Sequence, residues 1–217
     1  MTYSIAARCS RTGAFGIAIT SSSICVASRC AWVSPTGAVL TQNITDPALG
    51  PLGLSLIAKG RSAKDTVKEM VGATPFSDYR QLAAVDGEGR TASHSGAKAL
   101  PIFAEAHGAG CVAVGNILAD DGVPRAMIEA FALREADPLP ERLLRSLEAG
   151  LAQGGETADE HAAGLHVCDR HAWPVVDLRV DWHDDPIAEL RRVWTAYAPQ
   201  MDAYITRAVN PAAAPAF

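Results

Sequence analysis

The sequence opens with Met1-Thr2-Tyr3-Ser4-Ile5-Ala6-Ala7-Arg8, and its side chains follow a two-residue period from Thr2 onward. Successive side chains of an extended strand point to opposite faces. The odd-numbered residues from Tyr3 to Ala7 therefore share one face, and the even-numbered residues from Ser4 to Arg8 share the other. We predict a strand that begins at Thr2, with no leader segment before it and with its first residues held in a sheet.

Thr2 combines two groups that a hydrolase can use. Threonine is small enough for an aminopeptidase to remove the methionine before it, and this removal would leave a hydroxyl and a free α-amine on one residue. Such a residue carries its own general base, which is one way to activate a hydroxyl nucleophile. Many proteins also begin with Met-Thr for no catalytic reason, so these two residues alone leave both interpretations open.

Composition limits the classes of protein that the chain can belong to. The 217 residues are 48% hydrophobic and 20% charged, which is typical of a globular protein with a sizeable core. The net charge is −5 without a basic cluster, which argues against a nucleic-acid partner. No apolar run reaches the roughly 18 residues of a membrane span, so we expect no membrane partner and a cytoplasmic location.

The cysteines argue against disulfides and metal sites. The sequence has five of them, Cys9, Cys25, Cys30, Cys111 and Cys168, an odd number without a CxxC pair. We expect reduced, mostly buried thiols. A cysteine hydrolase that uses Cys25 or Cys30 stays open as a third interpretation, although neither residue has a diagnostic neighbourhood.

Two consecutive β-hairpins are predicted in the first forty residues. The first pairs the opening strand with residues 15–20 across a turn that ends at Gly13. A β-leaning segment over residues 24–33 and a strand over residues 38–42 form the second, around a turn at residues 34–37. Small side chains are frequent in both hairpins, as expected for a sheet that packs closely against another sheet.

The rest of the chain mixes helices with further strands. Helices are predicted around residues 54–57, over 63–71 with Ser62 as N-cap, over 124–135 and 140–153, and from Pro186 onward with a kink or break at Pro199. Strands are predicted over 80–86, 90–94, 110–115, 165–168 and 175–182. Runs of strands followed by runs of helices favour an α+β fold with antiparallel sheets, in one domain over residues 1–208, followed by a disordered tail over 209–217.

Several motifs do not support the chemistry they superficially resemble. Gly108-Ala109-Gly110 precedes a strand and lacks a following Gly-Lys-Ser/Thr, so we reject a phosphate loop. Residues 181–185 contain three aspartates and a histidine, but they fit a strand end and a helix cap better than a metal site. His161, His166 and His171 are five residues apart, a spacing that alternates faces on a strand. We predict no metal and no cofactor.

Polar residues gather at the ends of the predicted strands. Each can act locally in a turn, but as a set they can supply the donors that acyl transfer needs where an oxyanion develops. The set consists of Ser21 and Ser22, Thr41-Gln42-Asn43, His94-Ser95-Gly96 and Gly115-Asn116.

Several stretches of the chain, some of which contain residues of this set, resemble the DUF1028 family. The similar stretches are residues 2–8, 16–19, 37–42, 47–50, 94–96, 115–118, 177–181 and 186–192. The family is regarded as Ntn-hydrolase-like, so the resemblance implies a four-layer αββα sandwich of two antiparallel sheets. It also implies that Thr2 is the nucleophile after loss of Met1, in an enzyme that hydrolyses an amide-type C–N bond of a small molecule.

The expected site follows from this hypothesis. Asn116 and a backbone N–H near Ser21 or Ser22 would hold the oxyanion. Substrate contacts are expected from Gln42, Asn43, His94 and Glu156. Exposed sheet edges in such sandwiches also make a homo-oligomer the expected state.

The sequence departs from the family pattern at a few positions. Val114 replaces the usual Gln before Gly-Asn, and Ala158-Asp159 and His161-Ala162 replace Arg-Gly and Gln-Ser, whereas Glu156 keeps the usual acid. Either the substrate differs from the family's typical one or activity is lost. The alternative function is therefore a catalytically silent protein of the same fold that binds a small ligand or serves in an assembly.

Overall fold

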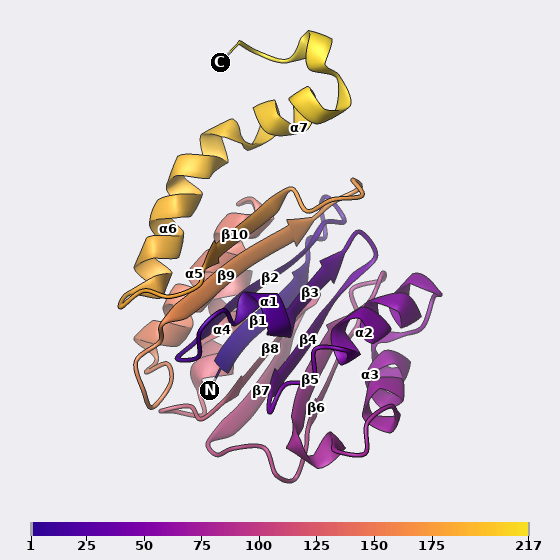
Figure 1. Cartoon of the computed structure of the whole chain (residues 1–217), viewed down its shortest axis with the longest axis vertical. Helices are drawn as coiled ribbons and strands as arrows, with labels where there is room; N and C mark the ends of the chain where they lie inside the picture. The colour runs from indigo at the N-terminus through magenta and orange to yellow at the C-terminus, as the bar shows by residue number, and fades with distance from the viewer. Residues whose placement is uncertain (1, 217) are drawn as a thin grey trace.

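The computed structural model describes residues 2–216, which form four layers with two β-sheets face to face between two layers of helices (Figure 1). The predicted α+β class, with two antiparallel sheets in an αββα sandwich, is confirmed. Every strand pairing within the sheets is antiparallel.

The first sheet has six strands in the order β10-β9-β2-β1-β8-β7. Its strands are β1 (Thr2–Arg8), β2 (Phe15–Ser21), β7 (Phe103–Gly108), β8 (Cys111–Asn116), β9 (Ala162–Cys168) and β10 (Val176–Val180). The opening strand therefore lies in the middle of the sheet, between β2 and β8. Gly13, with φ of +76°, allows the turn that returns the chain from β1 into β2.

The second sheet has four strands in the order β3-β4-β5-β6. They are β3 (Ala31–Ser34), β4 (Gly37–Asn43), β5 (Arg80–Val85) and β6 (Thr91–Ser95). The two predicted hairpins are thus real, but each one belongs to a different sheet, so the short link between β2 and β3 crosses the sandwich.

Helices cover the outer face of each sheet (Figure 1). The second sheet carries α2 (Leu49–Ala58) and α3 (Ala63–Gly72), and the first carries α4 (Val123–Ala132), α5 (Leu139–Ala152) and α6 (Pro186–Tyr197). Ser62 caps α3 as predicted, because its hydroxyl accepts a hydrogen bond from the Asp65 N–H at 3.1 Å.

The alternation of β1 divides its side chains between two cores. Tyr3, Ile5 and Ala7 pack in the core beneath α4, α5 and α6. Ala6 packs in the core between the two sheets, and the Ser4 hydroxyl donates to the Gln42 side chain of the opposite sheet at 2.6 Å. By the same period Thr2 belongs to the face between the sheets.

Two local features differ from the prediction, and a third agrees with it. Residues 24–33 are not one β-segment, because a short helix α1 (Ala27–Cys30) precedes β3 and packs Ala27 and Cys30 between the sheets. Strand β7 was not predicted, because as an edge strand it alternates polar residues with small ones. The predicted interruption at Pro199 is confirmed, because α6 ends at Tyr197 and the chain passes through a 3-10 turn, η2 (Ala198–Gln200), into a separate helix α7 (Met201–Val209).

The C-terminal end of the chain extends beyond the sandwich, where α7 continues past the sheets (Figure 1). Two further 3-10 turns are η1 (Ser77–Tyr79) and η3 (Pro211–Ala213). The predicted disorder of the 209–217 tail stays a prediction.

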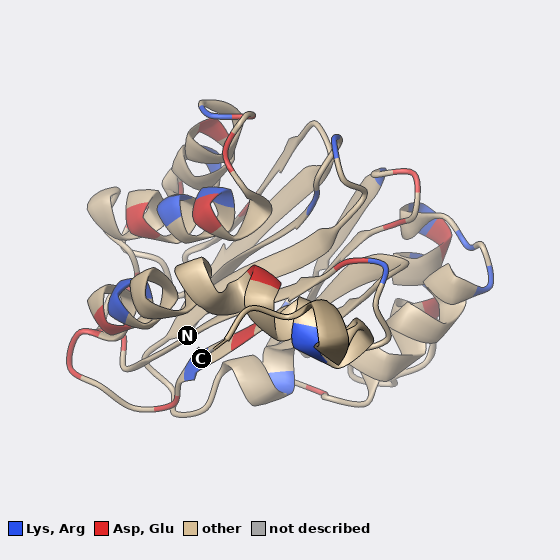
Figure 2. Cartoon of the chain, turned by 90° about the horizontal axis from the view of Figure 1, so that it is seen from above, with Lys and Arg blue, Asp and Glu red and all other residues tan. Residues whose placement is uncertain are grey.

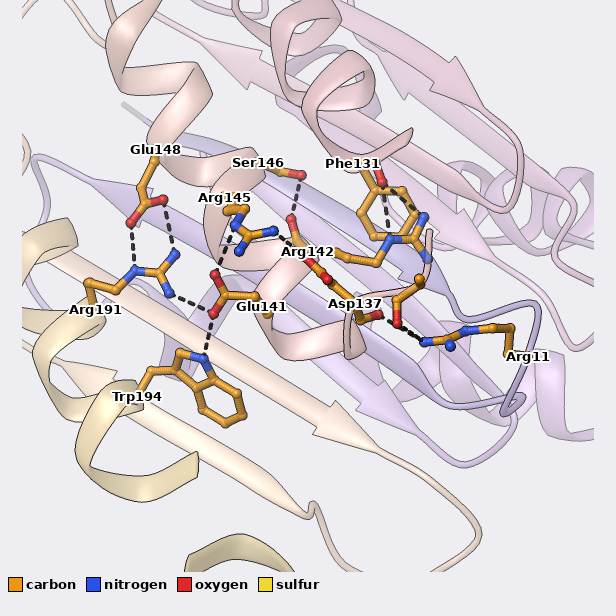
Figure 3. Close-up of polar contacts among 11 residues, drawn as sticks. Arg11, Phe131, Asp137, Glu141, Arg142, Arg145, Ser146, Glu148, Arg191 and Trp194 are labelled. Carbon is orange, nitrogen blue, oxygen red and sulfur yellow. Dashed lines mark hydrogen bonds and ion pairs between the residues drawn. The ribbon is translucent and has the colours of Figure 1, made fainter. Parts of the chain in front are cut away.

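Charged residues of both signs alternate along the outer helices, whereas the strands are largely uncharged (Figure 2). Among residues 2–216, no helix has the length and apolar character needed to cross a membrane. An ion-pair network joins α5 to α6, in which Arg191 donates two hydrogen bonds to Glu148 and one to Glu141 (Figure 3). Glu141 also accepts from the Trp194 indole at 2.9 Å, so the network holds α6 against the first sheet's helical layer.

Candidate functional site

Thr2 lies at the start of the central strand and is only 4% exposed. Its Oγ1 donates a hydrogen bond to the Ser21 Oγ at 3.4 Å, and its register partner on β8 is Asn116. The antiparallel pairing explains this proximity, because the first residue of β1 must lie beside the last residues of β2 and β8. Three strand ends predicted to carry polar side chains therefore do meet.

Ser21 and Ser22 form the wall on the β2 side. The Ser21 Oγ also accepts from the Ser23 N–H at 2.9 Å, which fixes the hydroxyl beside Thr2. The Ser22 N–H donates to Glu156 Oε2 at 3.2 Å. The Ser22 hydroxyl is buried and has no hydrogen-bond partner within the described part of the chain.

Glu156 enters this site through the turn that follows α5. Gly154 and Gly155 have φ of +126° and +60°, conformations that side-chain-bearing residues rarely adopt. A Cβ atom at Gly155 would lie 2.4 Å from Glu160 Oε1, so the turn also has no room for a side chain. A β-bridge between Glu156 and Leu118 then holds the acid next to the end of β8.

The carboxyl group of Glu156 is in an unusual environment. The residue is 6% exposed, and its Oε1 is buried without a hydrogen-bond partner among residues 2–216. Burial raises the pKa of Glu156 to about 7, the charge of Glu160 adds to the increase, and the bond from the Ser22 N–H opposes it. Glu156 can therefore exchange a proton near neutral pH, as a general acid or base must.

Asn116 closes the site from β8. Its Nδ2 donates to Gln81 Oε1 at 3.1 Å, while its Oδ1 is buried without a partner among the described residues. The next residue, Ile117, has φ of +52°, which costs about 1–2 kcal/mol for a β-branched side chain. The Ile117 N–H bonds to the Leu100 carbonyl and its own carbonyl accepts from Thr157, so this strained residue directs the chain from Asn116 toward the Glu156 turn.

A buried chain of amides supports the site from the second sheet. Gln42 Nε2 donates to Gln81 Oε1 at 2.8 Å and approaches the Thr2 carbonyl at 3.4 Å. Gln81 Nε2 donates in turn to the Gly115 carbonyl at 2.9 Å, next to Asn116. Both glutamines are fully buried. Gln42 therefore contacts the backbone of Thr2 from the side of the second sheet, and none of its groups is exposed to solvent.

Replacing Gln81 should destabilise the protein, because Gln81→Leu removes the acceptor of the Asn116 amide and the donor to Gly115. We expect the free energy of unfolding to fall by about 2 kcal/mol, since buried polar groups left without partners cost about 1–3 kcal/mol each. Denaturant unfolding measures this difference. Gln153→Leu is the matched control, because Gln153 is an exposed amide that bonds to Asp120. Equal effects of both substitutions would contradict a role for the amide chain.

Two predicted site residues lie elsewhere. Asn43 has φ of +74° and makes loop contacts, donating to the Tyr79 carbonyl at 2.6 Å and accepting from the Leu100 N–H at 3.2 Å. His94 pairs in register with Leu82, which faces the helical layer, and its Nε2 donates to the Ser77 carbonyl at 3.2 Å. The structure therefore does not bring His94 or the Asn43 side chain to Thr2.

The departures from the family pattern lie in different places. Val114 is buried in the core between the sheets, Ala158 is exposed, and His161 stacks on Trp182 with ring centroids 4.4 Å apart. Three of them contact the site through the backbone. The Val114 carbonyl accepts from Gln42 Nε2 at 3.3 Å, Ala162 pairs in register with Ser21, and the backbone N–H of His161 donates to the Ser21 carbonyl at 2.8 Å.

Sequence reasoning did not identify Gln81 or Glu160. Gln81 directly precedes the apolar run from Leu82 to Val85 within the same predicted strand, and this position was the available signal. Glu160 is 9% exposed, and its Oε1 accepts from the Glu156 N–H at 3.0 Å. The two buried acids together raise the pKa of the Tyr3 hydroxyl, an effect that adds to its burial.

The cysteines lack a catalytic partner in the described part of the chain. All five are free, and only Cys25 is not buried. Cys30 Sγ lies 3.3 Å from the Thr45 hydroxyl, and burial raises the pKa of its thiol. Within residues 2–216, no group of three or more His, Cys, Asp and Glu side chains is placed to hold a metal ion.

Fold and site together define an α+β sandwich with a buried threonine at the start of its central strand and a buried acid beside it. A family model described as "Family of unknown function (DUF1028)" matches residues 2–190, and the chain belongs to this family.

Solved structures are similar over most of the chain. Protein SPO2555 from Silicibacter pomeroyi, also of family DUF1028, has a TM-score of 0.83 at 30% identity and covers 91% of this chain and 89% of its own. An Anbu (Gly-1) mutant from Hyphomicrobium sp. strain MC1 has a TM-score of 0.44 at 12% identity, covering 94% and 97%. Anbu (ancestral beta-subunit) from Yersinia bercovieri has a TM-score of 0.40 at 13% identity, covering 93% and 97%. No curated protein matches the chain.

Proposed function

We propose that the chain is an N-terminal-threonine amidohydrolase that cleaves an amide-type C–N bond of a small molecule. One observation carries the proposal. The Thr2 hydroxyl lies in a buried site with three buried polar atoms that lack partners among the described residues, namely Ser22 Oγ, Asn116 Oδ1 and Glu156 Oε1. Buried polar groups are normally paired, so unpaired ones gathered beside one hydroxyl favour a site that a polar ligand completes.

The proposed reaction begins with attack of Thr2 Oγ1 on the substrate carbonyl carbon. The α-amine of Thr2 accepts the hydroxyl proton, and the tetrahedral intermediate forms an oxyanion. The candidate donors to it are the second Nδ2 hydrogen of Asn116 and a backbone N–H near Ser21 or Ser22, where the Ser22 N–H would leave Glu156 Oε2 to bind the oxyanion. The C–N bond then breaks as the leaving nitrogen takes the proton, and an acyl ester remains on Thr2. Water attacks this ester, transfers its proton to the amine and releases the acid.

The unpaired acceptors also favour a nitrogen substrate over an ester. Asn116 Oδ1 accepts hydrogen bonds only, and Glu156 Oε1 does so when ionised. An amide or ureide offers N–H groups to both acceptors, whereas an ester offers none. A site with buried acceptors discriminates strongly against an analogue that leaves them unpaired.

The mechanism requires a free α-amine on Thr2, which is present only if Met1 is removed. Met1 lies outside the residues that the structure describes. Intact-mass spectrometry of the purified protein measures this directly. We expect the main species to lack one methionine residue and to begin at Thr2. A preparation in which every molecule keeps Met1 would contradict the mechanism, because the amine would then be an amide without basic character.

The alternative function is a catalytically silent protein that binds a small ligand or serves in an assembly. The departures at Ala158 and His161 favour it, since His161 is attached to the Ser21 strand end. A thermal-shift screen with small amides, imides and ureas, followed by product analysis, separates the two. Stabilisation without product would support binding alone. A cytoplasmic location and a homo-oligomeric state belong to the same proposal, and size-exclusion chromatography with light scattering measures the latter.

A further inference from the structure

A cavity lies at the opposite end of β1 from Thr2. It has a volume of about 300 Å³, and its lining includes Arg8, Arg142 and the glycine-rich turn over residues 108–110. Thr2 and Arg8 are six residues apart on one strand, so the cavity is about 20 Å from the Thr2 hydroxyl at about 3.3 Å per residue. It is therefore separate from the site proposed above.

Arg142 is a buried cation that forms no ion pair with any residue from 2 to 216. It is 6% exposed, and its Nε and Nη2 both donate to the Phe131 carbonyl, at 3.1 and 2.9 Å. The guanidinium carbon lies 3.8 Å from the centre of the Phe131 ring, and Figure 3 shows the two groups stacked. This arrangement fixes the plane of the guanidinium group and leaves its Nη1 hydrogens without a hydrogen-bond partner among the described residues.

Arg8 adds a second positive charge. Its backbone N–H bonds to the Gly110 carbonyl at 2.8 Å, and its guanidinium group lies 5.9 Å from the centre of the Phe15 ring. Its Nε is buried without a hydrogen-bond partner in the part of the chain that the structure describes. Within residues 2–216, neither Arg8 nor Arg142 forms an ion pair with a carboxylate.

Two carboxylates also line the cavity, but each already has a donor. Glu88 pairs with Arg90 at 2.9 Å, and Glu135 accepts from the Ser10 hydroxyl at 2.9 Å. The glycine turns bring backbone close to the cavity, since a Cβ on Gly89 would lie 3.7 Å from the Gly110 Cα. Buried charges are normally paired, and planar guanidinium groups suit bidentate binding of oxyanions.

We propose that this cavity binds a small oxyanion, a phosphate or carboxylate group, between the guanidinium groups of Arg8 and Arg142. The volume of the cavity admits the free anion or a small molecule that carries it. The anion would complete the hydrogen bonds of both arginines and would stabilise the folded state.

Isothermal titration calorimetry with inorganic phosphate and with malonate tests the proposal, against chloride at matched ionic strength. We expect saturable binding of at least one oxyanion and none of chloride. Arg8→Gln should weaken this binding at least about 10-fold, because it removes a charge-assisted bond. Arg134→Gln is the matched control, because Arg134 is exposed and this substitution removes the same charge. We expect it to bind as the unchanged protein does.

The results distinguish a phosphate group from a carboxylate group as the ligand, and they also decide whether the proposal holds. Preference for phosphate indicates a phosphate group, and preference for malonate indicates a carboxylate. Absence of oxyanion binding, or binding that Arg8→Gln and Arg134→Gln weaken equally, would overturn the proposal. Arg142→Met is informative only if circular dichroism shows that it folds, which is why Arg8→Gln carries the test. Thr2→Ala should leave the binding unchanged, so failure of the amidohydrolase proposal does not affect this one.

Discussion

Thr2→Ala should abolish amide hydrolysis while leaving the fold intact. The substitution removes the proposed nucleophile but keeps the α-amine, the strand and the small side-chain volume. We expect the rate constant for turnover to fall by at least about 10³-fold, because the remaining groups can bind the substrate but cannot form the acyl ester. The measurement is product formation from an amide found in the screen, together with the melting temperature.

Two further variants make this result specific. Thr2→Ser keeps a hydroxyl and an amine on the same residue, and we expect it to retain measurable activity. Thr36→Ala removes a hydroxyl from the exposed turn between β3 and β4, and should change nothing. Full activity in Thr2→Ala would refute the proposed nucleophile. If that activity were also lost on treatment with a thiol reagent, a cysteine hydrolase would become the leading interpretation.

Glu156→Gln should change how stability depends on pH. In the folded protein, burial raises the pKa of Glu156 to about 7, whereas an unfolded glutamate titrates near about 4.5. Between these values the folded state holds a proton that the unfolded state has lost. Unfolding therefore releases a proton, and the free energy of unfolding falls as pH rises through this window. The full difference of roughly 2.5 pH units corresponds to about 3 kcal/mol.

Glutamine imitates the protonated acid and does not titrate. We therefore expect Glu156→Gln to match the unchanged protein near pH 4.5 and to exceed its stability by up to about 3 kcal/mol at pH 8. Urea unfolding at several pH values gives the difference curve. Glu129→Gln, exposed on α4, removes the same charge as a matched control. A difference curve for Glu156→Gln that stays flat from pH 5 to 8 would show that burial does not perturb this acid.

The sequence predicted the site best where strand pairing alone decides position. The alternation from Tyr3 to Ala7 fixed the faces of β1, and hairpin pairing then brought Ser21 next to Thr2. Asn116 was predicted from its place at a strand end, and its pairing with β1 follows from the antiparallel register. These contacts depend on local periodicity, which a single sequence displays directly.

The prediction failed where the face of a strand had to be known. His94 and Ser95 are consecutive, so they point to opposite faces, and it is Ser95 that reaches Gln81 at 3.1 Å between the sheets. Gln81 was missed for the same reason. Its contact with Asn116 depends on how the second sheet packs on the first, which a single sequence does not display. Strand β7 was missed because it is an edge strand whose apolar residues after Phe103 are only the small Ala104 and Ala106, and these give little hydrophobic signal.

The position of Thr2, enclosed at the beginning of the central strand, has a practical consequence for anyone who expresses the protein. An affinity tag fused before the first residue would turn the proposed catalytic amine into a peptide nitrogen, and a collection of amino-terminally tagged enzymes would record this protein as inactive. The opposite end of the chain leaves the sandwich on α7, clear of β1 (Figure 1). Purification handles belong there, or behind a protease site whose cleavage exposes Thr2 itself.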